Sequence, residues 1–186
     1  EDAATAGYAG LDIVLCSAGG STSKELAPKV AAAGAIVIDN SSAWRSDPAV
    51  PLVVSEVNPQ ALADLPKGIV ANPNCTTMAA MPVLRPLHDE AGLKRLTVST
   101  YQAVSGGGLE GIDVLARQLD HVGNAARELA VGGHDALLPA AEKWAVPIAH
   151  NVVPLNYVYA EDGYTEEEIK LRGESRKNLG LPGLPA

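Results

Sequence analysis

Cys75 has the sequence setting of a nucleophile. A short apolar run, Gly68-Ile69-Val70-Ala71, ends in Asn72-Pro73-Asn74, and the cysteine follows where a helical pattern begins. A thiol at a helix N-terminus faces unpaired backbone N–H groups and the positive end of the helix dipole, and both favour the thiolate. A cysteine that caps a turn or fills a small apolar gap would give the same pattern, because buried cysteine is common and inert. The position alone leaves both interpretations open.

Arg45 carries a group that suits the binding of an anion. Arg45 ends the polar loop Asn40-Ser41-Ser42-Ala43-Trp44-Arg45, and it is either a solvated loop residue or a guanidinium aimed at a phosphate or carboxylate. Glu167 and Lys170 stand three residues apart near the start of a helical pattern, where a solvated surface pair is the alternative. The second cysteine, Cys16, lies inside an apolar run and is expected to stay protonated and inert.

A parallel sheet with crossover helices is expected to position these residues. Two apolar runs flank a glycine-containing turn and a helical segment, in the order strand 11–17, helix 23–33 and strand 35–39. This βαβ pattern predicts an α/β fold, in which ligands bind beyond the carboxyl ends of the strands. The loops 17–21 and 40–45 are therefore expected at the same edge of the sheet.

Further elements are predicted downstream, with strands at 51–57, 68–71 and 96–104 and helices at 75–91, 109–130 and 165–179. Pro82 and Pro86 are expected to kink or divide the helix that starts at Cys75. The glycines of 106–111 match G-x-G-x-x-G between a strand and a helix, but the acidic residue that should end the next strand is missing. We therefore expect these glycines to let the backbone approach a ligand closely. The region 121–150 has no clear pattern.

Composition excludes several functional classes. The 186 residues are 47% hydrophobic and 19% charged, which suits one good-sized domain or two small ones. The net charge of −8, with no stripe of Lys or Arg, argues against nucleic acid and against an anionic membrane surface. No apolar run approaches a membrane span, and no metal-ligand spacing is present. The two cysteines suggest a reducing, cytosolic setting, and a chain that starts without Met in mid-pattern is expected to be an internal fragment.

Ordered motifs along the chain closely resemble signatures of the aspartate-semialdehyde dehydrogenase family. They are Ser17-Ala18-Gly19-Gly20, Ile38-Asp39-Asn40-Ser41-Ser42-Ala43-Trp44-Arg45, Asn72-Pro73-Asn74-Cys75-Thr76-Thr77, Tyr101-Gln102-Ala103-Val104-Ser105-Gly106 and Glu167-x-x-Lys170…Glu174-x-Arg176-Lys177. The resemblance covers nearly the whole chain and is weakest between residues 121 and 149. It implies part of a Rossmann-type NADP-binding domain over residues 1–74, followed by part of an α/β catalytic and dimerisation domain over 75–186.

The activity that the resemblance implies is NADP-dependent reductive dephosphorylation of aspartyl phosphate to aspartate semialdehyde. This reaction serves lysine, threonine, methionine and diaminopimelate biosynthesis, and the family implies a cytoplasmic homodimer or homotetramer with no metal. An acyl phosphate needs a thiolate to attack carbon, cations to hold the leaving phosphate and a hydride donor.

The resemblance also implies a role for each matching residue. Cys75 matches the nucleophile that forms the acyl-thioester, Asn74 is its neighbour in the site, and Gln102 orients the substrate. Glu167 matches the contact to the substrate amine, Arg45 and Lys170 match the phosphate-binding cations, and the cofactor-contacting positions are Ser17, Gly19, Ser105 and Gly106.

Two family features have no counterpart in the chain. One is the glycine fingerprint G-x-x-G-x-x-G after the family's first strand, and the other is the later segment with the substrate arginine and the histidine acid/base. None of the four histidines, His88, His121, His134 and His150, stands in the matching context. The chain alone is therefore expected to be inactive, and its longer parent active.

Other functions remain alternatives. N-acetyl-gamma-glutamyl-phosphate reductase uses the same thiolate chemistry but typically has Gly at the position of Asn74. Glyceraldehyde-3-phosphate dehydrogenase has Ser-Cys-Thr-Thr-Asn at its nucleophile, whereas here Asn74 precedes the cysteine and Met78 replaces the final Asn. The chain could also be a non-catalytic dimerisation or scaffold fragment, or a cysteine hydrolase, which would need a histidine partner.

Overall fold

The fold comes from a computed structural model that describes residues 2–131, 138–154, 159–160 and 163–186. The chain divides into two compact units: unit 1 is Glu1–Val98 with Glu167–Ala186, and unit 2 is Ser99–Glu166. The predicted domain division between residues 74 and 75 stays a prediction. The structure groups the C-terminal segment with the N-terminal residues in unit 1.

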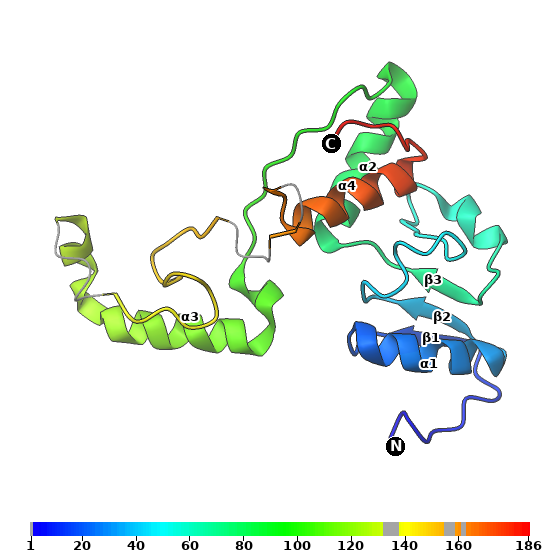
Figure 1. The fold of residues 1–186 in the computed structure, drawn as a ribbon, viewed down its shortest axis with the longest axis horizontal. Helices are drawn as coiled ribbons and strands as arrows, with labels where there is room; N and C mark the ends of the chain where they lie inside the picture. The colour runs from blue at the N-terminus through cyan, green and yellow to red at the C-terminus, as the bar shows by residue number, and fades with distance from the viewer. Residues whose placement is uncertain (1, 132–137, 155–158, 161–162) are drawn as a thin grey trace. The chain divides into compact units, whose positions relative to one another are not determined.

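Unit 1 contains the predicted parallel sheet. Its three strands, in spatial order, are β1 (Ile13–Cys16), β2 (Ile36–Asp39) and β3 (Ile69–Ala71). Both strand pairs are parallel, and helix α1 (Gly20–Ala32) crosses over from β1 to β2 (Figure 1). The α/β prediction and these three strands are confirmed. Helix α1 begins three residues earlier than the sequence pattern predicted, directly after Gly19.

Strands β1 and β2 are covered on one face only, whereas all three residues of β3 are buried. Leu26, Ala27 and Val30 of α1 are buried, and Ala27 and Val30 share a core cluster with Val37 of β2. On the other face, Ile13 is 59% exposed and Leu15 is 74% exposed. Apolar runs such as 11–17 and 35–39 suggest buried strands, but β1 and the alternate residues of β2 are not buried. Successive side chains of a strand point to opposite faces, and among the described residues no helix covers the second face.

The predicted strand at 51–57 is also wrong. Only one parallel bridge forms there, between Leu52 and Ala71. Buried Asn58 takes the backbone groups that would continue a ladder, because its Oδ1 accepts from the N–H of Val54 and its Nδ2 donates to the carbonyl of Leu52, each at 2.9 Å. The short helix η1 (Pro59–Ala63) follows, and it begins directly after Asn58 with Pro59, a residue suited to the first helical position.

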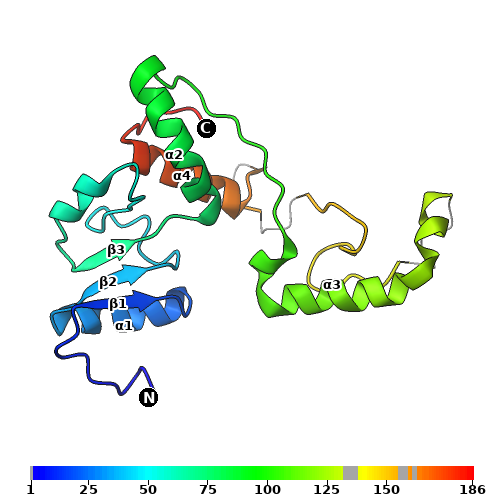
Figure 2. The ribbon, with the colours of Figure 1, turned by 180° about the vertical axis from the view of Figure 1, so that it is seen from behind.

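Two long helices complete unit 1. Helix α2 (Cys75–Ala91) and helix α4 (Glu166–Leu179) share a core cluster in which Met81 packs with Leu179 (Figure 2). Both helices were predicted with nearly these bounds. Pro82 and Pro86 do not divide α2, contrary to one expectation. Both prolines lie on its exposed side, where a carbonyl that loses its N–H donor can be hydrated.

Unit 2 is built around helix α3 (Gly108–Val122), with the short helices η2 (Val104–Gly107) before it and η3 (Gly123–Ala130) after it. The predicted helix to residue 130 is wrong in its second half, because Gly123 at φ 48° ends α3. The predicted strand at 96–104 is wrong as well. Residues 96–103 form no strand, and they do not pair with any strand in the described part of the chain. Their alternating apolar pattern is therefore not accompanied by the backbone hydrogen bonds of a sheet.

Candidate functional site

Three polar residues form a row at the carboxyl edge of the sheet. Ser17, Asn40 and Asn72 each follow the last residue of a strand, and the register aligns those last residues with one another. The amide of Asn72 donates to Asn40 Oδ1 at 2.7 Å, and the amide of Asn40 donates to Ser17 Oγ at 3.4 Å. The loops 17–21 and 40–45 therefore begin at the same edge, as the βαβ pattern predicted.

Arg45 crosses this row. Its Nε donates to the carbonyl of Asn72 at 2.8 Å, and one terminal nitrogen donates to the carbonyl of Asn40 at 3.1 Å. The other terminal nitrogen pairs with Glu174 at 3.2 Å, and only 12% of the arginine side chain is exposed. The guanidinium is thus fixed on two strand ends and one helix. Its role as a phosphate-binding cation stays a prediction.

Cys75 is the first residue of α2 and is exposed. Asn74 is the N-cap, and its Oδ1 accepts from the N–H of Thr76 at 2.9 Å and lies 3.9 Å from the thiol sulfur of Cys75. The predicted start of a helix at the cysteine is confirmed, and the exposure of Cys75 excludes the alternative of a thiol that fills a buried gap.

Helix α4 meets the Asn74 turn through two carboxylates. The side-chain amide of Asn74 donates to Glu167 Oε1 at 2.8 Å, and the backbone N–H of Asn74 donates to Glu174 Oε2 at 2.6 Å. Lys170 lies between them in sequence on the same helix and is partly buried. The structure therefore brings the predicted residues Arg45, Asn74 and Glu167 together around the turn before Cys75.

Two residues of this arrangement had no role predicted from the sequence, Glu174 and Lys177. The ammonium of Lys177 donates to three carbonyls of one loop, those of Arg45, Asp47 and Val50, at 2.7–2.9 Å. Burial lowers the pKa of Lys177, against the opposing effect of nearby Asp47. The signal that could have identified both residues is their helical spacing from Glu167 and Lys170.

Three predicted residues lie in unit 2. Gln102 is in the irregular segment before η2, so its expected place near the end of a strand at 96–104 is wrong. Ser105 and Gly106 lie within η2, directly before α3. The roles proposed for these three residues stay predictions.

The loop after β1 fits part of a dinucleotide. Gly19 has φ 92°, a conformation that favours glycine, and a Cβ added to it would meet nothing within 4 Å. Gly19 is also the N-cap of α1, and it has no side chain that could accept a hydrogen bond from the first N–H groups of this 13-residue helix. Such an arrangement suits a phosphate. Ser17 and Gly19 are thus compatible with the predicted cofactor contact.

One glycine of the G-x-G-x-x-G match, Gly111, has a packing role. A Cβ there would lie 2.7 Å from the carbonyl oxygen of Val104 and 3.2 Å from the Trp144 ring, so the backbone approaches its own unit at this position. A Cβ on Gly106 or Gly108 would meet nothing within 4 Å, and the expectation that these two glycines face a ligand stays a prediction.

Within unit 1, the structure records no hydrogen bond from Cys75 to Cys16 or to His88 among the described residues. Burial, and secondarily the charge of Asp39, raise the pKa of Cys16 in β1. His88 accepts a hydrogen bond from the N–H of Leu93 beyond the end of α2. His150 is exposed in unit 2, and His134 lies outside the described residues.

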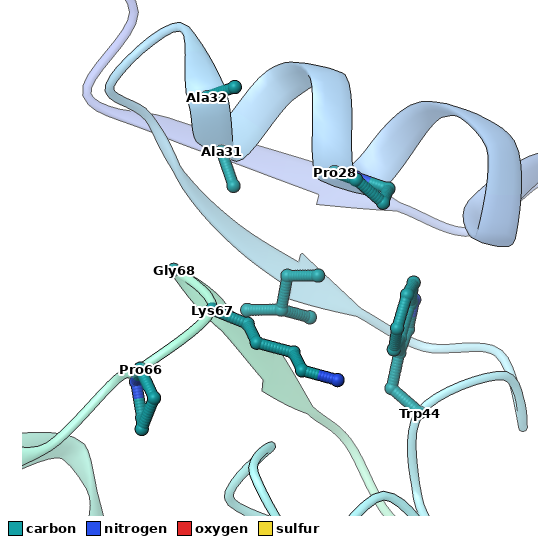
Figure 3. Close-up of a pocket in the computed structure, with 8 residues that line it drawn as sticks. Pro28, Ala31, Ala32, Trp44, Pro66, Lys67 and Gly68 are labelled. Atoms are coloured by element: carbon teal, nitrogen blue, oxygen red, sulfur yellow. The ribbon is translucent and has the colours of Figure 1, made fainter.

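A separate pocket of about 520 Å³ lies beside α1 and the start of β3. Figure 3 shows Lys67 reaching toward the ring of Trp44, with Pro28 above and Pro66 beside them. The Lys67 ammonium lies 5.6 Å from the ring centroid. None of the predicted site residues lines this pocket, so it carries none of the chemistry inferred above.

Two negative findings concern the described residues. No cluster of three or more His, Cys, Asp or Glu side chains among them could hold a metal ion. Likewise, no helix within the described ranges is both long and apolar enough to cross a membrane.

Comparison with known families gives two matches that together cover most of the chain. The family model described as "Semialdehyde dehydrogenase, NAD binding domain" matches residues 1–65, and the model described as "Semialdehyde dehydrogenase, dimerisation domain" matches residues 84–186.

Curated relatives named aspartate-semialdehyde dehydrogenase match nearly the whole chain. The protein from Streptomyces akiyoshiensis is 63% identical over 99% of this chain and 55% of its own length. The protein from Bacillus subtilis is 41% identical over 99% of this chain and 52% of its own length. The chain thus spans about half the length of the curated relatives it matches.

Solved structures agree. The structure titled aspartate semialdehyde dehydrogenase II from Vibrio cholerae, complexed with ASA, matches with a TM-score of 0.88 at 36% identity, over 100% of this chain and 52% of its own. A probable aspartate-semialdehyde dehydrogenase from Pseudomonas aeruginosa matches with a TM-score of 0.80 at 25% identity, over 99% of this chain and 52% of its own.

Proposed function

The chain belongs to the semialdehyde dehydrogenase family, and on this premise we propose that it is part of an enzyme that reduces aspartyl phosphate to aspartate semialdehyde. One observation carries the proposal. Arg45, Asn74 and Glu167 come from segments far apart in sequence, yet hydrogen bonds join them around the turn that precedes Cys75. A cation, a carboxylate and an exposed thiol are the groups that an amino-acid acyl phosphate requires.

The proposed reaction begins with the thiolate of Cys75, which attacks the acyl carbon of the substrate. Phosphate leaves, and the carbon is held as a thioester on the sulfur. Arg45 and Lys170 bind the phosphate group, Glu167 binds the substrate amine, and Gln102 orients the acyl group. The first turn of α2 adds the positive end of its dipole near the reacting atoms.

NADP is the proposed cofactor, and it supplies hydride chemistry when bound. Ser17 and Gly19 of unit 1 would hold part of it, with Ser105 and Gly106 as the predicted contacts from unit 2. The open backbone at Gly19 and the uncapped start of α1 support the first pair.

The complete activity is proposed for the longer protein that contains the chain. Because the chain spans about half the length of its relatives, we expect the 186 residues alone to show no turnover.

We also propose a cytoplasmic homodimer or homotetramer that acts in lysine, threonine, methionine and diaminopimelate synthesis. The match of residues 84–186 to a dimerisation domain supports the assembly.

The test measures phosphate-dependent oxidation of aspartate semialdehyde by the full-length protein, with NADP and NAD compared in parallel. We expect NADP to be preferred, and Cys75→Ser to abolish turnover while Cys16→Ser retains it. Retained turnover in Cys75→Ser would show that another group is the nucleophile.

The same assay separates the alternatives. Faster reaction with N-acetylglutamate semialdehyde would assign the chain to N-acetyl-gamma-glutamyl-phosphate reductase, and glyceraldehyde 3-phosphate as the better substrate would assign it to that dehydrogenase. Absence of any phosphate-dependent redox activity in the full-length protein would favour a scaffold, and hydrolysis without a nicotinamide cofactor would favour a cysteine hydrolase.

A further inference from the structure

One face of α4 carries four charged residues at helical spacing, namely Glu167, Lys170, Glu174 and Lys177. Glu174 and Lys177 contact the loop at Arg45 and the turn at Asn74 that precedes Cys75. Lys177 holds the loop that starts at Arg45, and Glu174 reaches the guanidinium and the turn at Asn74. The charged face of α4 is therefore in direct contact with Arg45 and with the turn at the start of α2, which together we call the candidate anion site.

In the described part of the chain, the buried carboxylate of Glu174 has two hydrogen-bond partners. Its side chain is 6% exposed, its Oε1 accepts from Arg45, and its Oε2 accepts from the backbone N–H of Asn74. In a capping box, a glutamate inside the helix accepts the N–H of the N-cap residue. Here the acceptor comes from another helix, and its carboxylate is placed one residue from Cys75.

The electrostatic consequence concerns anions. The start of α2 and the guanidinium of Arg45 are both positive, and a site with these groups alone would bind an anion tightly and release it slowly. We propose that Glu174 is the counter-ion of this site, a positioning residue that holds Arg45 against the Asn74 turn and limits how strongly the region around Cys75 attracts anions. The effect of Glu174 on phosphate release rests on the proposed function, whereas its effect on how strongly the region attracts anions is independent of that function.

The test uses the full-length protein and two alkylating reagents that differ in charge, iodoacetate and iodoacetamide. The rate of modification of Cys75 by each reagent is followed by peptide mass spectrometry, and the ratio of the two rates reports the local charge. Glu174→Gln should raise the ratio of iodoacetate to iodoacetamide about five- to tenfold, because one nearby negative charge is removed. Added salt should reduce this difference. An unchanged or lower ratio overturns the proposal.

Two control variants separate charge from structure. Glu25→Gln makes the same charge change in an exposed pair with Lys29 on α1, and it should leave the ratio unchanged. Glu174→Asp keeps the charge but shortens the side chain, and its ratio should stay near that of the wild type. If Glu174→Asp changes the ratio as much as Glu174→Gln does, the effect is structural and the counter-ion role is refuted.

The proposed reaction provides a second measurement. In the oxidative assay, where phosphate is a substrate, Glu174→Gln should lower the KM for phosphate several-fold because phosphate binds more tightly. In the reductive direction, where phosphate is a product, the same variant should lower kcat because phosphate leaves more slowly. A raised or unchanged KM for phosphate contradicts the proposal. If the wild-type protein shows no phosphate-dependent turnover, the proposed function fails, and the alkylation ratio still decides the role of Glu174.

Discussion

Two glycines inside helices should respond to alanine in opposite directions. Replacing a helical glycine with alanine stabilises an unstrained helix by about 1 kcal/mol. Gly173 lies in α4, and a Cβ there would meet nothing within 4 Å. At Gly111 the added methyl would lie 2.7 Å from the carbonyl oxygen of Val104 and 3.2 Å from the Trp144 ring. Overpacking of this kind costs roughly 1–3 kcal/mol, and the nearer atom is backbone, which cannot rotate away.

We therefore expect Gly173→Ala to stabilise unit 1 by about 0.5–1 kcal/mol and Gly111→Ala to destabilise unit 2 by about 1–2 kcal/mol. The two tryptophans report the units separately, since Trp44 lies in unit 1 and Trp144 in unit 2. Urea unfolding is followed by fluorescence, with Trp144→Phe as the background for the first variant and Trp44→Phe for the second. If Gly111→Ala is as stable as its background or more stable, the close approach of Gly111 to Val104 and Trp144 does not explain the glycine at this position.

Three more predictions concern unit 1. A neutral alkylating reagent at one equivalent should modify Cys75 at least about tenfold faster than Cys16, because the first is exposed and the second is half-buried with a raised pKa; equal labelling in peptide mass spectra would contradict an active-site thiol. Lys177→Met leaves three loop carbonyls without their charged donor and should lower the unfolding free energy by about 2–4 kcal/mol in urea titrations, whereas Lys29→Met on the exposed surface should change it by less than about 0.5 kcal/mol. The hydrogen bond from Lys67 holds the pKa of Asp47 below its value in the unfolded chain. The stabilising effect of this pair is therefore present above the ordinary aspartate range, and it is lost as the pH falls through the lower pKa of the folded state. Asp47→Asn should accordingly flatten the acid side of the stability profile, and a profile that is unchanged from the wild type would refute the contribution of this pair.

The elements that could be predicted from the sequence are those with a strong local signal. The strands at 13–16, 36–39 and 69–71 are apolar runs between turn residues, and the helix at Cys75 has both an N-cap and an apolar face. The two wrong strands had an equally good apolar pattern. They differ in what surrounds them, since Asn58 takes the ladder positions of one and the other pairs with no strand among the described residues.

The candidate site shows the same division. Its residues could be named from short motifs, and the carboxyl edge of the sheet could be inferred from the βαβ pattern. The contacts that connect them could not, because Asn74 and Glu174 are 100 residues apart and Arg45 and Glu174 are 129 apart. No local pattern specifies which distant carboxylate a turn will meet. The helical spacing of Glu174 and Lys177 was visible in the sequence, but their targets were not.

The long sequence separation between α4 and the turn that it contacts has a consequence for how the protein folds. The sheet and α2 are formed from residues that leave the ribosome well before Glu174 and Lys177, and domains begin to fold during synthesis. Contacts of such long sequence separation close slowly, because the loop entropy is lost before they contribute. The Asn74 turn and the loop after Arg45 can therefore take their final geometry only after α4 has docked. The cysteine leaves the ribosome about 100 residues before the carboxylate that contacts its turn.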